Sequence, residues 1–171
     1  MACLLEGVNI VPGFAALIVN YDTDQTGAYV CLKGYGKLGV LFASAGGTNT
    51  DIPTLTVYQA TTVAGGSAKV ATVVDTVWIK QYVTTLAAVA DFTKTSQTLA
   101  STVVGNAASD TELLLEYFEI DAEDLDVDNS FDCVRVDVAQ AASAGSHYGC
   151  LLYFLLDPRY PQATSLSAIA D

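Results

Sequence analysis

Positive charge is scarce in this sequence. Only 7 of the 171 residues are lysine or arginine, against 19 aspartates and glutamates, and the formal net charge is −12. Proteins bind nucleic acids mainly by neutralising phosphates with basic side chains, so this balance argues against DNA or RNA as a partner. It disfavours anionic membrane surfaces for the same reason.

Long apolar runs are missing as well. No uninterrupted apolar segment approaches the roughly 18 residues that a membrane-spanning helix needs. The N-terminal residues 1–21 have no basic start, contain Glu6 and are broken by Gly7, Pro12 and Gly13, which does not fit a signal peptide. We therefore expect no membrane partner, and a protein that is made and kept in a cytoplasm.

The residue patterns of common catalytic and nucleotide sites are absent too. His147 is the only histidine, and no G-x-S-x-G motif presents a nucleophilic serine. Gly34 and Gly36 in KGYGKLG lack the following lysine and helix of a phosphate-binding loop, and fit a tight turn between strands. We expect no enzyme activity and no cofactor.

The four cysteines are far apart and form no C-x-x-C pair. Cys31, Cys133 and Cys150 lie inside apolar, strand-like runs, where a free cysteine behaves as a small hydrophobic residue. We expect these three thiols to be buried and reduced, with a disulfide or a metal site as the alternatives.

What the sequence does contain is alternation with a period of two and many β-branched residues. In TLTVY, Leu55 and Val57 take one face while the residues between them take the other, and Val134, Val136 and Val138 alternate in the same way. Roughly nine such segments are separated by turns rich in glycine, serine, threonine and asparagine. This pattern predicts an all-β, single-domain β-sandwich, or jelly roll.

Residues 15–156 form this expected sandwich, with an N-terminal arm at 1–14 and a C-terminal tail at 157–171. The segment 150–156 (CLLYFLL) is apolar on both faces, which indicates a central strand or one covered by a neighbouring subunit. Residues 84–110 are compatible with one long hairpin or with a projecting loop.

The aromatic residues admit two interpretations. Trp78 shares a strand face with Lys80 and Tyr82, and a row of exposed aromatic rings would stack on sugars. Packing in the core or in a subunit interface is the other interpretation, and the one we favour.

An acidic stretch, residues 119–132, holds seven carboxylates in fourteen positions. An EF-hand loop that began at Asp124 would have Asn129 in place of its glycine and Arg135 in place of its closing glutamate, so a site of that type is excluded. A glycosidase pair is disfavoured because this run is too hydrophilic to bury a carboxyl group. A weak calcium site of another type remains an alternative.

The favoured interpretation of this stretch is a crossover between two strands. A short helical turn at Ala122–Asp126 would have Asp121 as its N-cap, and Leu125 would reach into the core beneath it.

Several segments together resemble a family of small virion proteins of tailed bacteriophages. They are a K-G-Y turn, a Q-A-T-x-x-x-G-x-x-A-K strand pair, an acidic D-x-x-D-L-D crossover into F-D-C-x-R, and a closing P-R-Y-x-Q-A. The match spans residues 29–171 and is most similar to the capsid decoration, or cement, proteins. This resemblance implies synthesis in a bacterial host cytoplasm and a place on the outer surface of the capsid.

The resemblance further implies a homodimer or homotrimer that clamps neighbouring major capsid proteins. The alternative is a head-fibre base or a carbohydrate-binding β-sandwich module. Because the apolar residues of the two arms lie outside the expected strands, we expect partner subunits to cover them. The interface candidates are Leu4, Leu5, Val8, Ile10, Phe14, Arg159, Tyr160, Leu166 and Ile169.

Calorimetric titration with calcium should detect no stoichiometric site at residues 121–132. The reason is that Arg135 occupies the position of the closing bidentate carboxylate. A dissociation constant tighter than about 0.1 mM, at the limit of weak extracellular calcium modules, would contradict this expectation.

Overall fold

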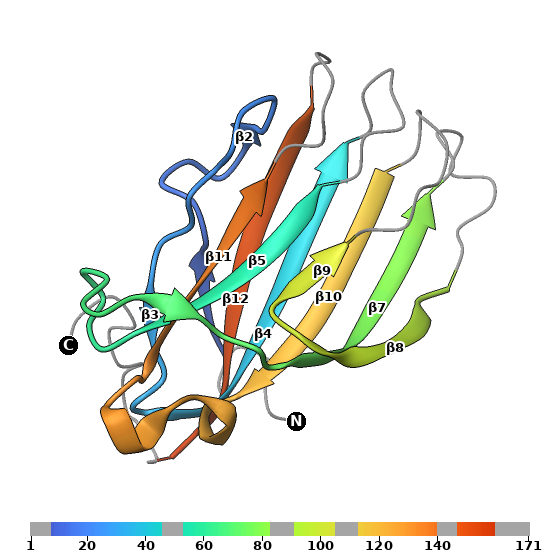
Figure 1. The fold of residues 1–171 in the computed structure, drawn as a ribbon. Coiled ribbons are helices and arrows are strands. Elements are labelled where there is room, and N and C mark those ends of the chain that lie inside the picture. The colour runs from blue at the N-terminus through green and yellow to red at the C-terminus, as the bar shows by residue number, and fades with distance from the viewer. Residues whose placement is uncertain (1–7, 46–52, 83–90, 105–112, 140–146, 160–171) are drawn as a thin grey trace.

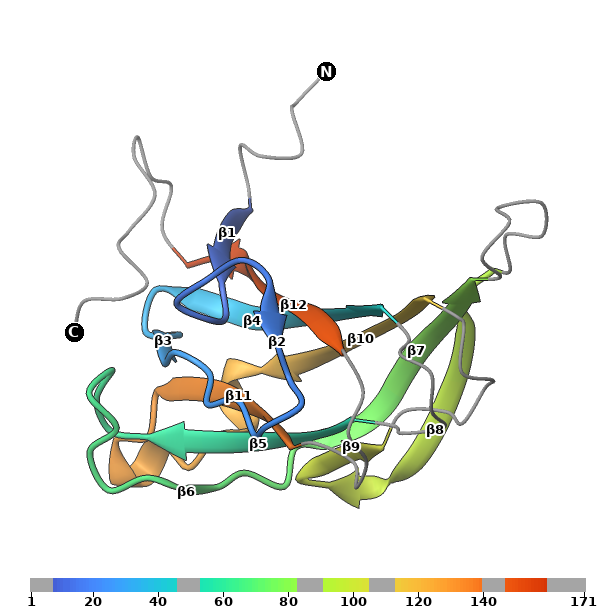
Figure 2. The same ribbon diagram turned by 90° about the horizontal axis from the view of Figure 1, so that it is seen from above.

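A computed structural model describes residues 8–45, 53–82, 91–104, 113–139 and 147–159. In these residues the regular structure is almost entirely antiparallel β-strand, arranged as two sheets that face each other (Figures 1 and 2). The predicted all-β sandwich is therefore confirmed.

The larger sheet has seven strands in the order β1-β12-β4-β10-β7-β8, and β2 also pairs with β12. The strands are β1 (Asn9–Pro12), β2 (Val19–Asn20), β4 (Tyr35–Ala45), β7 (Val74–Tyr82), β8 (Thr93–Ala100), β10 (Leu113–Asp121) and β12 (Tyr148–Pro158).

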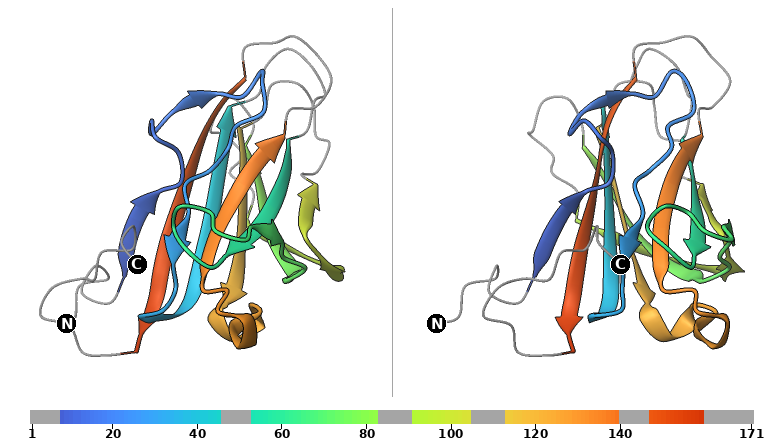
Figure 3. Two further views of the ribbon diagram at one scale, coloured as in Figure 1. Left: turned by 60° about the vertical axis from the view of Figure 1, so that its left-hand side comes forward. Right: turned by 90° about the vertical axis from the view of Figure 1, so that its left-hand side faces the viewer.

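The smaller sheet has five strands in the order β3-β11-β5-β6, with β9 paired to β5. The strands are β3 (Val30–Cys31), β5 (Thr54–Ala60), β6 (Lys69–Val70), β9 (Thr102–Val104) and β11 (Cys133–Ala139). Figure 3 shows the two layers edge-on, with β12 and β4 in one and β11 and β5 in the other.

The core lies between the sheets and is built by alternation along each strand. Leu55 and Val57 of β5 are fully buried, as the sequence predicted, and Phe118 and Ile120 of β10 bury their side chains from the opposite sheet. Burying each such side chain stabilises the fold by about 1.5–3 kcal/mol.

A buried hydrogen bond ties the two layers together. Tyr153 of β12 is completely buried, and its hydroxyl accepts a hydrogen bond of 2.9 Å from the backbone N–H of Val136 in β11. Gly27 packs against the same point, where a Cβ atom would lie 2.2 Å from the Val136 carbonyl oxygen. Only a glycine leaves room for this contact.

The N-terminal arm does not lie outside the sheet as expected. Asn9–Pro12 form β1, which pairs with β12 from Asn9 opposite Leu155 to Pro12 opposite Leu152. Phe14 is buried in the core at 4% exposure, so it is not available as an interface residue. The expectation was wrong here because the long strand β12 offers an edge on which this short apolar segment completes its backbone hydrogen bonds.

The C-terminal boundary also shifts. Strand β12 continues to Pro158, which lies opposite Tyr35, and the N–H of Arg159 donates to the carbonyl of Gly34 over 2.9 Å. The tail therefore begins after Arg159 rather than at Asp157. Strand β12 lies between β1 and β4, in agreement with its prediction as a central strand.

Residues 84–110 are described in part. β8 pairs antiparallel with β7, and β9 pairs with β5 in the other sheet. The two described strands of this segment therefore belong to different sheets and do not form one long hairpin with each other. Residues 84–90 and 105–110 lie outside the described ranges.

The acidic stretch forms the predicted crossover, at the end of the sandwich shown lowest in Figure 1. It contains two 3₁₀ helices, η2 (Ala122–Asp124) and η3 (Val127–Asn129), and Leu125 between them is buried. Asp121 occupies the N-cap position without a capping hydrogen bond, because its carboxylate lies 3.3 Å from the ammonium group of Lys37. Among the described residues, no helix has the length and apolar character to cross a membrane.

Substituting Leu125→Ala should lower the free energy of unfolding by about 2–5 kcal/mol, because it removes a buried side chain and leaves a cavity. The control Val127→Ala changes a residue of the same crossover that is 52% exposed, and should stay within about 0.5 kcal/mol of the parent. Urea denaturation measures both. Equal losses for the two variants would show that Leu125 does not anchor the crossover.

Candidate functional site

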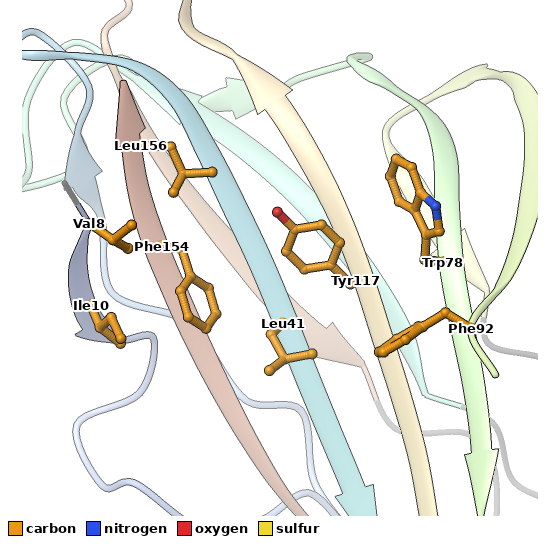
Figure 4. A pocket seen from close by; sticks show the side chains of 8 residues that line it. All are labelled: Val8, Ile10, Leu41, Trp78, Phe92, Tyr117, Phe154 and Leu156. Carbon is orange, nitrogen blue, oxygen red and sulfur yellow. The ribbon is translucent and has the colours of Figure 1, made fainter. Parts of the chain in front are cut away.

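The outer face of the larger sheet, which points away from the smaller sheet, carries an apolar groove of about 490 Å³. We call it the outer groove. Side chains from five neighbouring strands and their flanks line it (Figure 4): Val8, Ile10, Leu41, Trp78, Phe92, Tyr117, Phe154 and Leu156.

Strand register brings these residues into rows. Tyr117 of β10 lies directly opposite Leu41 of β4 on one side and opposite Trp78 of β7 on the other. The rings of Trp78 and Tyr117 are 5.9 Å apart at 52°, a tilted packing that is favourable for aromatic pairs. Phe154 and Leu156 extend the apolar surface onto β12.

Gly39 shapes the centre of the outer groove. It lies on β4 between Phe154 and Glu119 of the neighbouring strands, and a Cβ atom at this position would be 2.7 Å from the Tyr117 hydroxyl oxygen. Because Gly39 has no side chain, the Tyr117 ring can pack against β4 at this position.

Polar contacts fix the Tyr117 ring at one end. Its hydroxyl donates to Glu119 over 2.8 Å, and the same carboxylate accepts from the Lys37 ammonium group over 2.9 Å. Burial, together with the hydrogen bond to Glu119, raises the pKa of Tyr117 well above its ordinary value. Burial alone would raise the pKa of Glu119, but the hydrogen bonds from Lys37 and Tyr117 lower it overall.

The rim of the outer groove at β7 and β8 is cationic. The ammonium group of Lys94 lies 5.7 Å from the centre of the Trp78 ring, and that of Lys80 lies 5.5 Å from the centre of the Phe92 ring. Ammonium groups over aromatic faces are attracted by the ring quadrupole. An occupant of the groove would therefore meet positive charge at this rim.

The structure sorts the nine interface candidates. Val8 and Ile10 line the outer groove, Phe14 belongs to the core, and Arg159 is exposed where β12 ends. The remaining candidates lie outside the described residues: Leu4, Leu5, Tyr160, Leu166 and Ile169.

Six residues of the groove were missed as interface candidates from sequence: Leu41, Trp78, Phe92, Tyr117, Phe154 and Leu156. Two signals pointed to them. Segment 150–156 is apolar on both faces, and Trp78 alternates with inward-facing residues of its strand. Neither signal shows which strands are neighbours, so the row itself was not visible.

A second feature is a buried acid inside the sandwich. Glu116 of β10 is fully buried opposite Phe42 and Ile79, and neither of its carboxylate oxygens has a hydrogen-bond partner among the described residues. Burial raises its pKa from 4.5 to about 8. Glu116 does not line the outer groove, so the two features do not combine into one substrate site.

His147 lies just before β12 and is 2% exposed. Its Nδ1 is 2.9 Å from a carboxylate oxygen of Asp22, and the centre of its ring lies 5.5 Å from that of Tyr21. Within the part of the chain that the structure describes, Nε2 has no hydrogen-bond partner. The backbone N–H of His147 donates to the same Asp22 oxygen over 3.0 Å, and this bond is the main reason that the pKa of Asp22 is lowered. The pair fastens the start of β12 to the β2 region.

The buried thiols lie on the smaller sheet. Cys31 and Cys133 face each other in the β3–β11 pair, and with Asp132 they place three ligand atoms within 4.8 Å of one another. This is where the described residues come nearest to a metal site. A hydrogen bond to Cys31, followed by burial, raises the pKa of Cys133 far above its ordinary value, which favours neutral thiols over metal-binding thiolates.

Burial of the thiols is as expected for Cys31 and Cys133. Cys150 differs, because it is only half-buried on the outer side of β12. It alternates with the buried residues Gly149 and Leu151, so its side chain points away from the core.

No family model and no curated protein matches this chain. Among solved structures, the SPBc2 prophage-derived protein YomS is similar with a TM-score of 0.42 and 12% identity, over 85% of this chain and 92% of that one.

Structures of infectious bursal disease virus are also similar. The Gx strain has a TM-score of 0.26 and 10% identity over 87% of this chain and 40% of that one. The VP2 subviral particle has a TM-score of 0.25 and 9% identity over 96% and 44%. Similarities this remote carry no functional argument.

Substituting Glu116→Gln should flatten the dependence of stability on pH. Because the folded pKa of about 8 exceeds the ordinary 4.5, the folded protein keeps a proton that the unfolded chain loses. The parent should therefore lose stability as the pH rises from about 4.5 through 8, at up to about 1.4 kcal/mol per pH unit, and the variant should not. Urea denaturation between pH 5 and 9 measures the difference.

The exposed Glu123→Gln is the matched control and should follow the parent curve. Parallel curves for Glu116→Gln and the parent would mean that this carboxyl group has an ordinary pKa in the folded protein.

Proposed function

We propose that this protein is a non-enzymatic structural protein of a tailed-phage virion, which decorates and cements the outer surface of the capsid by clamping neighbouring major capsid proteins. The outer groove is the surface through which it binds a neighbouring subunit of the shell. The existence of this groove is the observation that carries the proposal.

The groove favours a protein partner for a physical reason. Soluble monomers rarely leave a large continuous apolar patch in water, and larger patches mark interaction sites. The outer groove concentrates Trp78, Tyr117, Phe92 and Phe154, and tryptophan and tyrosine are enriched among the residues that dominate binding energy in interfaces. A repeated lattice multiplies such modest contacts into a stable shell.

The segments that carry the resemblance to decoration proteins support the proposal, because they meet in space. The side-chain oxygen of Gln59 accepts a hydrogen bond of 2.9 Å from the backbone N–H of Asp126, and Lys69 forms an ion pair with the same aspartate. The Lys69 ammonium group also lies 4.1 Å from the centre of the Phe131 ring. The residues of the Q-A-T strand pair and of the D-L-D crossover thus hold one end of the sandwich together, which is a structural role.

One specific observation favours a second function, a head-fibre base or a carbohydrate-binding module. The aromatic rings of the outer groove lie on the outside of the sandwich: Trp78, Tyr117 and Phe154 are half-buried, and Phe92 is 45% exposed. Tyrosine and tryptophan combine an apolar ring with a polar group, as a stacking surface for sugars requires. Glu119 and Lys37 stand beside Tyr117 as hydrogen-bonding groups.

Incubating the purified protein with capsids that lack it should give saturable binding at a copy number set by the lattice. Substituting Phe154→Ser should weaken this binding by roughly thirtyfold, about 2 kcal/mol, because it removes an aromatic anchor from the groove. Co-sedimentation with capsids measures both quantities.

The control Leu17→Ser alters an apolar side chain that is 58% exposed and lies outside the groove, and should bind as the parent does. Unchanged saturation by Phe154→Ser would remove the groove from the binding surface. If the parent does not bind capsids but binds a glycan, and Phe154→Ser abolishes the glycan binding, the second function is established instead.

A further inference from the structure

We propose that the outer groove receives residues 160–171 of a second copy of this chain, so that subunits are joined by exchanged C-terminal segments. The inference deepens the proposed function and rests on it: the subunit that the groove binds is another copy of this chain, and the resulting oligomer is the unit that clamps the major capsid proteins. Residues 160–171 lie outside the described part of the structure.

The length of this segment matches the groove. From β1 to β8 the larger sheet spans five strand spacings of about 4.8 Å, or roughly 24 Å. The 12 residues of the segment reach about 40 Å when extended. A segment that crosses the strands can therefore cover the whole groove.

The direction of the chain at Arg159 favours a second copy over the same copy. The N–H of Arg159 is still hydrogen-bonded to the carbonyl of Gly34, which lies just before the first residue of β4. Arg159 is thus the last described residue at the end of the sheet where β12 meets the start of β4, whereas the groove extends back along β12 on the face that carries Phe154 and Leu156. Docking in the same subunit would require the chain to turn back over the sheet, and docking in a neighbour would not.

The chemistry of the segment matches the groove. It contains Tyr160, Leu166 and Ile169 as large apolar residues, and Asp171 is its only charged residue. Two subunits that each carry a net charge of −12 repel each other when they pack face to face. A segment with a single charged residue can dock with less of this repulsion. The side-chain carboxylate of Asp171 is complementary in charge to Lys94 at the β7–β8 rim.

Exchange of this kind is self-consistent, because each copy offers one groove and one segment. Reciprocal exchange closes a dimer, and exchange around a ring closes a trimer.

The test uses the full-length protein and two readouts. Sedimentation velocity over a range of concentrations reports the oligomeric state. Trp78 is the only tryptophan in the chain and lies in the groove, so its fluorescence and its quenching by acrylamide report whether the groove is covered. We expect an oligomer in which Trp78 is shielded.

The variant Leu166→Asp with Ile169→Asp should raise the dissociation constant of the oligomer at least about tenfold and expose Trp78 to quencher, with an unchanged circular dichroism spectrum. Its matched control, Ser165→Asp with Ser167→Asp, adds the same charge to the same segment and should remain oligomeric. Lys94→Glu should weaken the oligomer, and adding Asp171→Lys to it should restore the association.

Three results would overturn the inference. The first is a monomeric parent in which Trp78 is shielded from quencher, which would indicate docking within one subunit. The second is an oligomer that the variant Leu166→Asp with Ile169→Asp leaves intact. The third is an equal change in the dissociation constant of the oligomer for the two double variants. Capsid binding is measured separately on the same proteins. If the parent binds capsids but its oligomer does not depend on residues 160–171, the segment exchange is wrong and the decoration role stands. If the oligomer depends on the segment but never binds capsids, the decoration role is wrong and the exchange stands.

Discussion

The pairing of β12 with β4, from Tyr148 opposite Ala45 to Pro158 opposite Tyr35, is the constraint on which the rest of the structure depends. Because side chains alternate across a sheet, this register sends Tyr153 toward the smaller sheet and Phe154 toward solvent. A shift of one residue would exchange the two faces and bury the wrong set. The hydrogen bond from Val136 to the Tyr153 hydroxyl holds the register from the opposite layer.

Different parts of the sandwich carry different tasks. The crossover end is fastened by short-range polar contacts, in which Asp126 is bound by Gln59, Lys69 and Asn129. The outer face of the larger sheet instead carries the apolar groove, with the Lys37–Glu119 ion pair at one end of the Tyr117 ring and Lys80 and Lys94 at the rim. This division fits a protein whose fold is made rigid by one set of residues while another set remains available to a neighbour.

Burial of Glu116 in the core of the sandwich is unfavourable for the stability of the fold. A carboxyl group buried beside Phe42 and Ile79, with no hydrogen-bond partner among the described residues, is energetically unfavourable unless it is protonated, and its pKa is raised for this reason. The core is therefore most stable when this group is neutral. Its place on β10, one residue before Tyr117, puts a pH-dependent group directly behind the outer groove, on the opposite face of the same strand.

The sequence by itself determined the fold class and the character of most segments. Period-two alternation in 54–58 and 134–138 specifies strands with one buried face, since only that face can leave water, and Leu125 had to enter the core because it is the only large apolar residue between the acids of 121–126. Tertiary structure alone decided which strands are neighbours. Local pattern carries no information on pairing partners, so it could not reveal that Asn9–Pro12 join β12, that Phe14 is core, or that Trp78, Tyr117 and Leu41 form one row. That row exists only because antiparallel pairing brings segments distant along the chain to within one strand spacing of each other, about 4.8 Å.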